Sequence, residues 1–200
     1  MATSTRDALI AAATDLLDVG GVDGVTLREV GNRAGVSHNA PYKHFADKEM
    51  LLAAVAAREL DHLREVMVTA QAEGVAAEEV LRRALREYVA WALERPARFA
   101  LVFGRWSHHS ETLGSSAAAA WDVLVAATAA AQRAGGLPGD DPERMAALLR
   151  AAAHGAVELA LTGHLAADGK GKVAPDELVE DLFGYLRVSA RVAAGSSSCT

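Results

Sequence analysis

The sequence is poor in residues that cross-link or interrupt a chain, with one cysteine and five prolines among its 200 residues. The lone Cys199 excludes an intrachain disulfide framework and indicates a reducing compartment. Aromatic residues make up only 5% of the chain, whereas alanine, the strongest helix former, is abundant. Because no stretch alternates apolar and polar residues as strands do, the composition predicts an all-α protein.

The sequence also lacks a positive charge surplus and an uninterrupted apolar run. Its formal net charge of −6 excludes a uniformly basic surface, but it allows a local basic patch. Residues 1–20 include charged side chains, unlike the apolar core of a secretory signal. The alanine-rich stretches near 117–131 and 145–165 are interrupted by charges such as Asp122, so neither is expected to cross a membrane. We therefore expect a cytoplasmic protein.

Motifs of common enzymes are missing as well. The sequence has no Walker-type glycine loop, no G-x-G-x-x-G after a strand, no H-E-x-x-H and no G-x-S-x-G. The segment "DGKGK" at 168–172 lacks the strand-turn-helix setting of a phosphate loop, and Cys199 lies in a Gly/Ser tail that could not orient a catalytic thiol. We expect neither enzymatic activity nor a cofactor.

Apolar residues at helical spacing predict about nine helices along the chain. Gly20-Gly21 is expected to end the first helix, Thr26 to begin the second, and Asp47 to begin a long fourth helix. Later helices fit 76–94, 96–108, 113–134, 142–164 and 175–193. The expected organisation is a helix-turn-helix DNA-binding domain at 1–47, a helical effector-binding and dimerisation domain at 48–194, and a disordered tail at 195–200.

The helix-turn-helix prediction comes from the segment between Thr26 and His44. It contains a helix of about eight residues, a tight turn at Gly35, and a short second helix. Either Ser37 or Asn39 can cap that second helix, and with Asn39 as the cap Pro41 falls in the tolerated first turn. Asparagine can pair with adenine edges, and Tyr and Lys can reach phosphates.

The local charge gives this prediction only weak support. Residues 26–50 carry four Lys/Arg against three Asp/Glu, whereas residues 1–50 carry five against seven. We therefore expect modest non-specific affinity, with selectivity resting on a few placed contacts.

Residues 8–52 resemble the DNA-binding domain of the TetR family of transcriptional regulators. The resemblance lies in T-x-x-x-V-x-x-x-A-G-V-S-x-x-x-x-Y-x-H-F-x-x-K-E-x-L, which runs from Thr26 to Leu51. Pro41 stands where many members have another residue, which puts the tilt of the second helix in question. The resemblance implies a repressor that a small molecule releases from a palindromic operator in double-stranded DNA. The implied DNA-binding residues are Thr26, Arg28, Ser37, His38, Asn39, Tyr42, Lys43, His44 and Lys48. Ala40 joins them because it lies on the outward face of the second helix, where its methyl group can contact a thymine methyl.

The same resemblance implies that the helices after about residue 75 form a ligand-binding core and a dimer interface. Most aromatic residues cluster between 88 and 121, as they would around an apolar ligand, although each could equally be ordinary core. His154 and Glu158 lie one helical turn apart and could share a polar ligand; we expect no metal there. The candidate ligand-binding residues are Tyr88, Trp91, Phe99, Phe103, Trp106, His109, Trp121, His154 and Glu158.

The last two long helices carry small and apolar residues that would allow close pairing across a two-fold axis, so we expect a homodimer without membrane contact. Two alternatives remain at this point. One is a helical ligand- or protein-binding module with little DNA affinity. The other is a ligand-dependent activator or a corepressor-type regulator.

Overall fold

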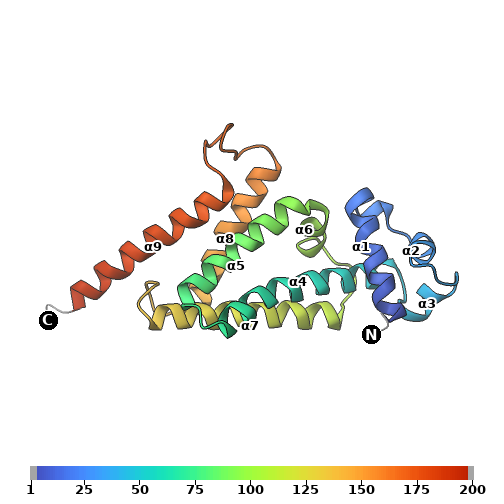
Figure 1. The fold of residues 1–200 in the computed structure, drawn as a ribbon, viewed down its shortest axis with the longest axis horizontal. Helices are drawn as coiled ribbons and strands as arrows, with labels where there is room; N and C mark the ends of the chain where they lie inside the picture. Colours follow the sequence, from blue (N-terminus) through green and yellow to red (C-terminus); the bar gives the residue numbers. More distant parts are fainter. Residues whose placement is uncertain (1–3, 198–200) are drawn as a thin grey trace. The chain divides into compact units, whose positions relative to one another are not determined.

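The structure is a computed structural model that describes residues 4–197. Over this range the chain is all-α, as predicted, and the single β-type contact is an isolated bridge between Ala166 and Gly171 (Figure 1). The described helices are α1 (Thr5–Gly24), α2 (Leu27–Arg33), α3 (Ala40–His44), α4 (Lys48–Ala72), α5 (Ala77–Glu94), α6 (Pro96–Val102), α7 (Glu111–Arg133), α8 (Pro142–Leu161) and α9 (Pro175–Ser197).

The chain divides into two compact units. The first contains the described residues up to Asp61 together with Arg95–Ala118, and the second contains His62–Glu94 together with the described residues from Ala119 onward. Helices α4 and α7 therefore each contribute residues to both units. The functional division expected at 47–48 stays a prediction, because compactness alone does not test it.

Helix starts follow from capping side chains that the sequence makes visible. The Glu29 N–H donates to the Thr26 hydroxyl at 3.1 Å at the start of α2, and the Met50 N–H donates to the Asp47 carboxylate at 2.8 Å at the start of α4. Each bond satisfies a backbone donor that has no partner inside the helix. Both predicted starts are confirmed.

The regular first helix is interrupted at Gly21, with φ +62° and ψ −169°, where the sequence predicted its end; the range of α1 continues across this kink to Gly24. Two other predicted helix ends are wrong. Helix α6 ends at Val102 rather than near 108. Further along the chain, the Ser107 and His108 N–H groups donate to Glu49 instead of bonding within a helix. Helix α8 ends at Leu161, before a left-handed glycine.

The C-terminal helix is longer than predicted. Helix α9 extends to Ser197, four residues beyond the expected end at 193 and into the segment expected to be a disordered tail. Cys199, the residue used to infer a reducing compartment, lies outside the described residues.

The core of the first unit forms where α1 packs against α2, α3 and α6. Leu9, Leu17, Val30 and Phe99 are almost completely buried there. Arg98 on α6 links α1 and α4 through hydrogen bonds. It donates to both carboxylate oxygens of Asp18 at 2.9 and 2.6 Å, and to Glu59 at 3.1 Å.

The core of the second unit forms where α5, α8 and α9 pack against one another (Figure 1). Its most buried large side chains include Leu81, Val89, Leu149, Val157 and Phe183. Helix α5 is strongly amphipathic: one face enters this core, and the opposite face carries arginine and glutamate residues.

Helix α7 departs from the expectation that no segment resembles a membrane span. Helix α7 is long enough and apolar enough to cross a membrane, with an 18-residue window of mean hydropathy 1.3. Alanines supply most of this apolar character, and the window tolerates Asp122. A single helix of this kind is weak evidence for a membrane, since core helices of globular proteins have the same composition.

Candidate DNA-binding and ligand-binding sites

The turn between α2 and α3 is built around Gly35. Its φ of +67° lies in the left-handed region that glycine adopts without strain. The Gly35 N–H donates to the Asn32 carbonyl at 3.1 Å, and the Val36 N–H donates to the Gly31 carbonyl at 3.1 Å. These bonds close the end of α2 and reverse the chain toward α3, as the sequence predicted for a helix-turn-helix.

Pro41 fixes how α3 lies on α2. Of the two candidate caps, Asn39 occupies the N-cap position, so Pro41 falls in the first turn of the five-residue helix α3. Pro41 is buried against Gly31, where an added Cβ would lie only 3.1 Å from the proline Cγ. Gly31 thus provides the close approach between the two helices, a role that sequence reasoning missed.

The remaining side chains of the turn and α3 form a polar outer surface. Ser37, His38, Asn39, Lys43 and His44 are all exposed, and Ala40 is half-buried. The Asn39 side chain makes no capping hydrogen bond, so its amide is available to another partner.

Tyr42 stands on the same surface and is 53% exposed, which is high for an aromatic side chain. Its ring lies 6.0 Å from the His38 ring. Phe45 is buried instead, and the Arg6 guanidinium lies 5.3 Å from its ring centroid. The two aromatic residues of this segment therefore have different surroundings: Phe45 belongs to the core, and Tyr42 faces solvent.

The flanking candidates lie at or near helix starts. Thr26 and Arg28 are exposed at the start of α2, and Lys48 is half-buried at the start of α4. Arg33, also counted in the local charge, forms an ion pair with Asp15 at 3.1 Å. Its charge is already matched, so Arg28, Lys43 and Lys48 are the cations of this segment that remain for phosphate contacts.

The predicted ligand-binding residues are divided between the two units. In the second unit, Tyr88 and Trp91 are buried on α5 with ring centroids 6.1 Å apart. The Tyr88 hydroxyl is hydrogen-bonded to His154 Nδ1 at 2.8 Å, and His154 Nε2 lies 3.8 Å from Glu158. Burial raises the pKa of Tyr88, which keeps the phenol protonated at neutral pH.

The other predicted ligand-binding residues have separate surroundings. In the second unit, the Arg150 guanidinium lies 4.5 Å from the Trp121 ring centroid. In the first unit, the Phe99 and Phe103 ring centroids are 5.3 Å apart and His109 is exposed. Trp106 helps to line a cavity of about 360 Å³, together with Val22, Lys48, Glu49, Leu52, Ala100, Leu101, Gly104, Arg105 and Ser107.

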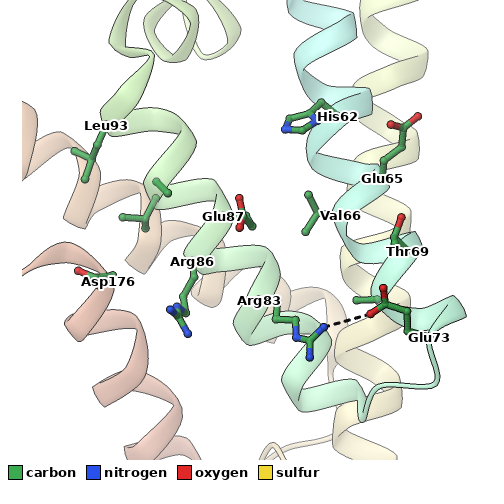
Figure 2. Close-up of a pocket in the computed structure, with 13 residues that line it drawn as sticks. His62, Glu65, Val66, Thr69, Glu73, Arg83, Arg86, Glu87, Leu93 and Asp176 are labelled. Carbon is green, nitrogen blue, oxygen red and sulfur yellow. Dashed lines mark hydrogen bonds and ion pairs between the residues drawn. The ribbon is translucent and has the colours of Figure 1, made fainter.

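A larger cavity, of about 830 Å³, lies in the second unit between α4 and α5 (Figure 2). None of its lining residues is among the predicted ligand-binding residues. The lining comprises His62, Glu65, Val66, Thr69, Ala70, Glu73, Arg83, Arg86, Glu87, Val89, Ala90, Leu93 and Asp176. Its volume is in the range of cavities that hold small organic ligands. Among the residues that the structure describes, no group of three or more His, Cys, Asp or Glu side chains is arranged to hold a metal ion.

Comparison with known proteins agrees with this architecture. The protein-family model described as "Bacterial regulatory proteins, tetR family" matches residues 9–55. A second family model, "Tetracyclin repressor-like, C-terminal domain", matches residues 81–184 and by itself covers just over half of the chain. The tetracycline repressor protein class A from transposon 1721 of Escherichia coli is 50% identical over 48 residues, which span 24% of this chain and 22% of that repressor.

Solved structures extend the likeness over almost the whole chain. A protein of unknown function from Rhodococcus sp. RHA1 is 30% identical, with a TM-score of 0.79 over 94% of this chain and 96% of that one. The transcriptional regulator FadR from Bacillus subtilis, solved with stearoyl-CoA, shares the fold at 15% identity, with a TM-score of 0.69 over 90% and 96%. SmeT, the repressor of a Stenotrophomonas maltophilia multidrug efflux pump, also shares the fold, at 24% identity. Its TM-score is 0.64 over 90% of this chain and 89% of the SmeT chain.

A helix-turn-helix with an exposed polar second helix, joined to a helical domain with a cavity, defines a class of DNA-binding transcriptional regulators. Matches to both domain models and a whole-chain relative at 30% identity place the chain within that class. It belongs to the TetR family, and its fold and family are those of a regulator rather than an enzyme.

Proposed function

We propose that this protein is a cytoplasmic repressor that binds a palindromic operator as a homodimer and is released by a small-molecule effector. The observation that carries the proposal is the outer surface of α3 and the turn before it. Pro41 and Phe45 are buried, while the polar side chains of His38, Asn39 and Lys43 point outward with Tyr42. A helix with one face packed and the other exposed and hydrogen-bonding suits the DNA major groove.

Each candidate contact has a distinct role in this proposal. Asn39 is suited to reading an adenine edge, and the Ala40 methyl to contacting a thymine methyl. Tyr42, Lys43 and Lys48 supply phosphate contacts, which set affinity and register but carry little sequence information. The remaining predicted residues are proposed as supporting contacts on the same surface, namely Thr26, Arg28, Ser37, His38 and His44.

A homodimer is proposed because helices α8 and α9 carry large apolar side chains that are exposed to solvent. Leu148 and Leu159 on α8 are about half exposed, and Tyr185, Val188 and Val192 on α9 are more than 60% exposed. In Figure 1 these two helices run next to each other, in agreement with their contacts. Pairing the same face of two subunits would bury these side chains and present two recognition helices to one palindrome, roughly 34–36 Å apart.

Release by an effector requires that the ligand bind more tightly to the form that cannot bind DNA. Helix α4 is one continuous 25-residue helix that begins directly after the helix-turn-helix, and its later residues line the 830 Å³ cavity. A ligand that shifts α4 along or about its axis would change the separation of the two recognition helices. Neighbours such as the SmeT–triclosan complex show that this fold holds small molecules, although at 23% identity the likeness concerns the fold alone.

The proposal is tested by selecting binding sites for the purified protein from a random DNA library at low and near-physiological salt. An enriched inverted repeat that survives the higher salt is the expected result. Tyr42→Ala should reduce affinity for that repeat at least about tenfold at fixed salt, because it removes a proposed phosphate contact. The domain should stay folded, since the Tyr42 side chain is exposed. Binding that shows no motif and disappears with salt would instead support a helical module without operator affinity. A reporter assay with and without ligand separates a repressor from an activator or a corepressor-dependent regulator.

A further inference from the structure

We infer that the 830 Å³ cavity between α4 and α5 selects an organic cation with an apolar body, and excludes anionic ligands of similar size. This inference deepens the proposed function, on which its regulatory meaning rests, by naming the chemical class of the effector. It concerns only residues of the second unit.

The walls of the cavity combine apolar contact with uncompensated negative charge. Val66, Ala70, Val89, Ala90 and Leu93 supply the apolar part of the lining. Four carboxylates, Glu65, Glu73, Glu87 and Asp176, face two guanidiniums, Arg83 and Arg86. Carboxylates that are not matched by a cation favour a positively charged guest.

Both guanidiniums of the lining are already paired with carboxylates. Arg83 lies 3.4 Å from Glu73 and 3.5 Å from Glu79, and Arg86 lies 3.9 Å from Glu180. An anionic ligand would have to displace these carboxylates while approaching the others. In contrast, Glu65, Glu87 and Asp176 form no ion pair with any residue in the described part of the chain.

Glu87 is the residue best placed to meet a cation. Figure 2 shows Glu87 extending from α5 toward α4, and Val66 extending from α4 toward α5. The Arg83–Glu73 ion pair bridges the two sides at one end, drawn as a dashed line in Figure 2. A ligand lying along the cavity would therefore place an apolar body against Val66 and Ala90 and its positive centre beside Glu87.

The surface next to the cavity strengthens the same selection. A second hollow of about 580 Å³ shares Arg86 and Asp176 with the first. Its other lining residues are Glu79, Arg82, Val173, Glu177, Glu180 and Asp181, so acids again outnumber bases. A continuous negative field across both hollows would raise the local concentration of cations and repel anions.

The test compares two ions of nearly the same size and shape but opposite charge, tetraphenylphosphonium and tetraphenylborate. Isothermal titration calorimetry with the full-length protein, without DNA, should detect binding of tetraphenylphosphonium and much weaker binding of tetraphenylborate. Glu87→Gln should weaken tetraphenylphosphonium binding about fivefold, and Glu65→Gln combined with Glu87→Gln more than tenfold. Asp122→Asn is the matched control, since it removes one exposed carboxylate of the same unit outside both hollows.

Equal or tighter binding of tetraphenylborate would overturn the charge selection. An equal loss in the Glu87→Gln and Asp122→Asn variants would also overturn it, because only overall charge would then matter. A separate measurement of operator affinity isolates the proposed function. If the protein without ligand binds no operator, the proposed repressor function is refuted, whereas the inference about the cation site is unaffected. Cation binding that follows the expected pattern but does not change operator affinity supports the cavity inference and refutes the effector step.

Discussion

Gly31→Ala should weaken operator binding while leaving the protein folded, because Gly31 sets the distance between α2 and α3. The added methyl group would lie 3.1 Å from Pro41 Cγ and 3.5 Å from Cδ. Carbon atoms in favourable contact are about 3.5–4.0 Å apart, so the proline must move by a few tenths of an ångström. Pro41 is part of the five-residue helix α3, and its movement would tilt the residues that face DNA.

The effects on stability and on binding are expected to separate. Alanine gains about 0.8–1.0 kcal/mol over glycine inside a helix, whereas overpacking typically costs about 1–3 kcal/mol. The net change in the free energy of unfolding should thus be a loss of at most about 2 kcal/mol. A tilt that costs about 1 kcal/mol of contacts per subunit would cost about 2 kcal/mol per dimer, roughly a thirtyfold loss of operator affinity.

Fluorescence anisotropy with the selected operator at fixed salt measures the binding change, and thermal unfolding measures the stability change. Gly114→Ala is the matched control, because nothing lies within 4 Å of the added carbon in α7. It should stabilise the protein slightly and leave DNA affinity unchanged. Pro41→Ala in the Gly31→Ala background should recover part of the lost affinity. If Gly31→Ala binds the operator within twofold of the unmodified protein, the contact does not position α3.

Two further predictions concern ion pairs of the first unit. Arg98→Ala should lower the free energy of unfolding by about 2–3 kcal/mol, and the melting temperature by about 4–12 °C, because Arg98 is half-buried and pairs with the buried Glu59. Arg58→Ala, which removes the exposed 2.9 Å pair with Asp7, should cost less than about 1 kcal/mol, and equal losses would refute this distinction. The second concerns the pair of Glu49 and His108. Hydrogen bonds from the backbone N–H and the side chain of His108 lower the pKa of Glu49, and the same side-chain hydrogen bond raises the pKa of His108 above its ordinary 6.5. Both groups are therefore charged from about pH 4.5 to 6.5, and the ion pair is lost as the pH rises through the raised pKa of His108. An NMR titration should give a His108 pKa above 6.5, and this pKa should fall toward 6.5 in Glu49→Gln.

Local structure was predictable where one side chain decides it. Thr26 and Asp47 cap helices with their own oxygen atoms, and Gly35 turns the chain with its own backbone freedom. Gly31 could not be identified in this way, because its need for a missing Cβ arises from Pro41, ten residues later. The non-helical backbone at Ser107 and His108 was equally hidden, since their N–H groups donate to the distant Glu49.

The predicted ligand-binding set relied on aromatic residues, and helix α5 shows the weakness of that signal. Tyr88 and Trp91 lie on the buried face of α5, where large apolar side chains are expected in any core. The residues of α5 that line the 830 Å³ cavity include Arg83, Glu87 and Ala90, which in sequence look like an ordinary solvent-facing surface. These three side chains are exposed in the structure as well, and only the placement of α4 beside them makes this face one wall of the cavity. The sequence therefore predicts a ligand-binding domain without locating its cavity.

Counting charges in a sequence window gave a misleading picture of the DNA-binding region for a related reason. Residues 1–50 contain more acids than bases, yet Asp7 and Asp18 are paired with Arg58 and Arg98, which lie outside that window. Asp15 is paired with Arg33 within it. Three of the seven acids of residues 1–50 are therefore matched by arginines, two of which lie outside the window, so the charge count of the window overstates the negative charge of this region.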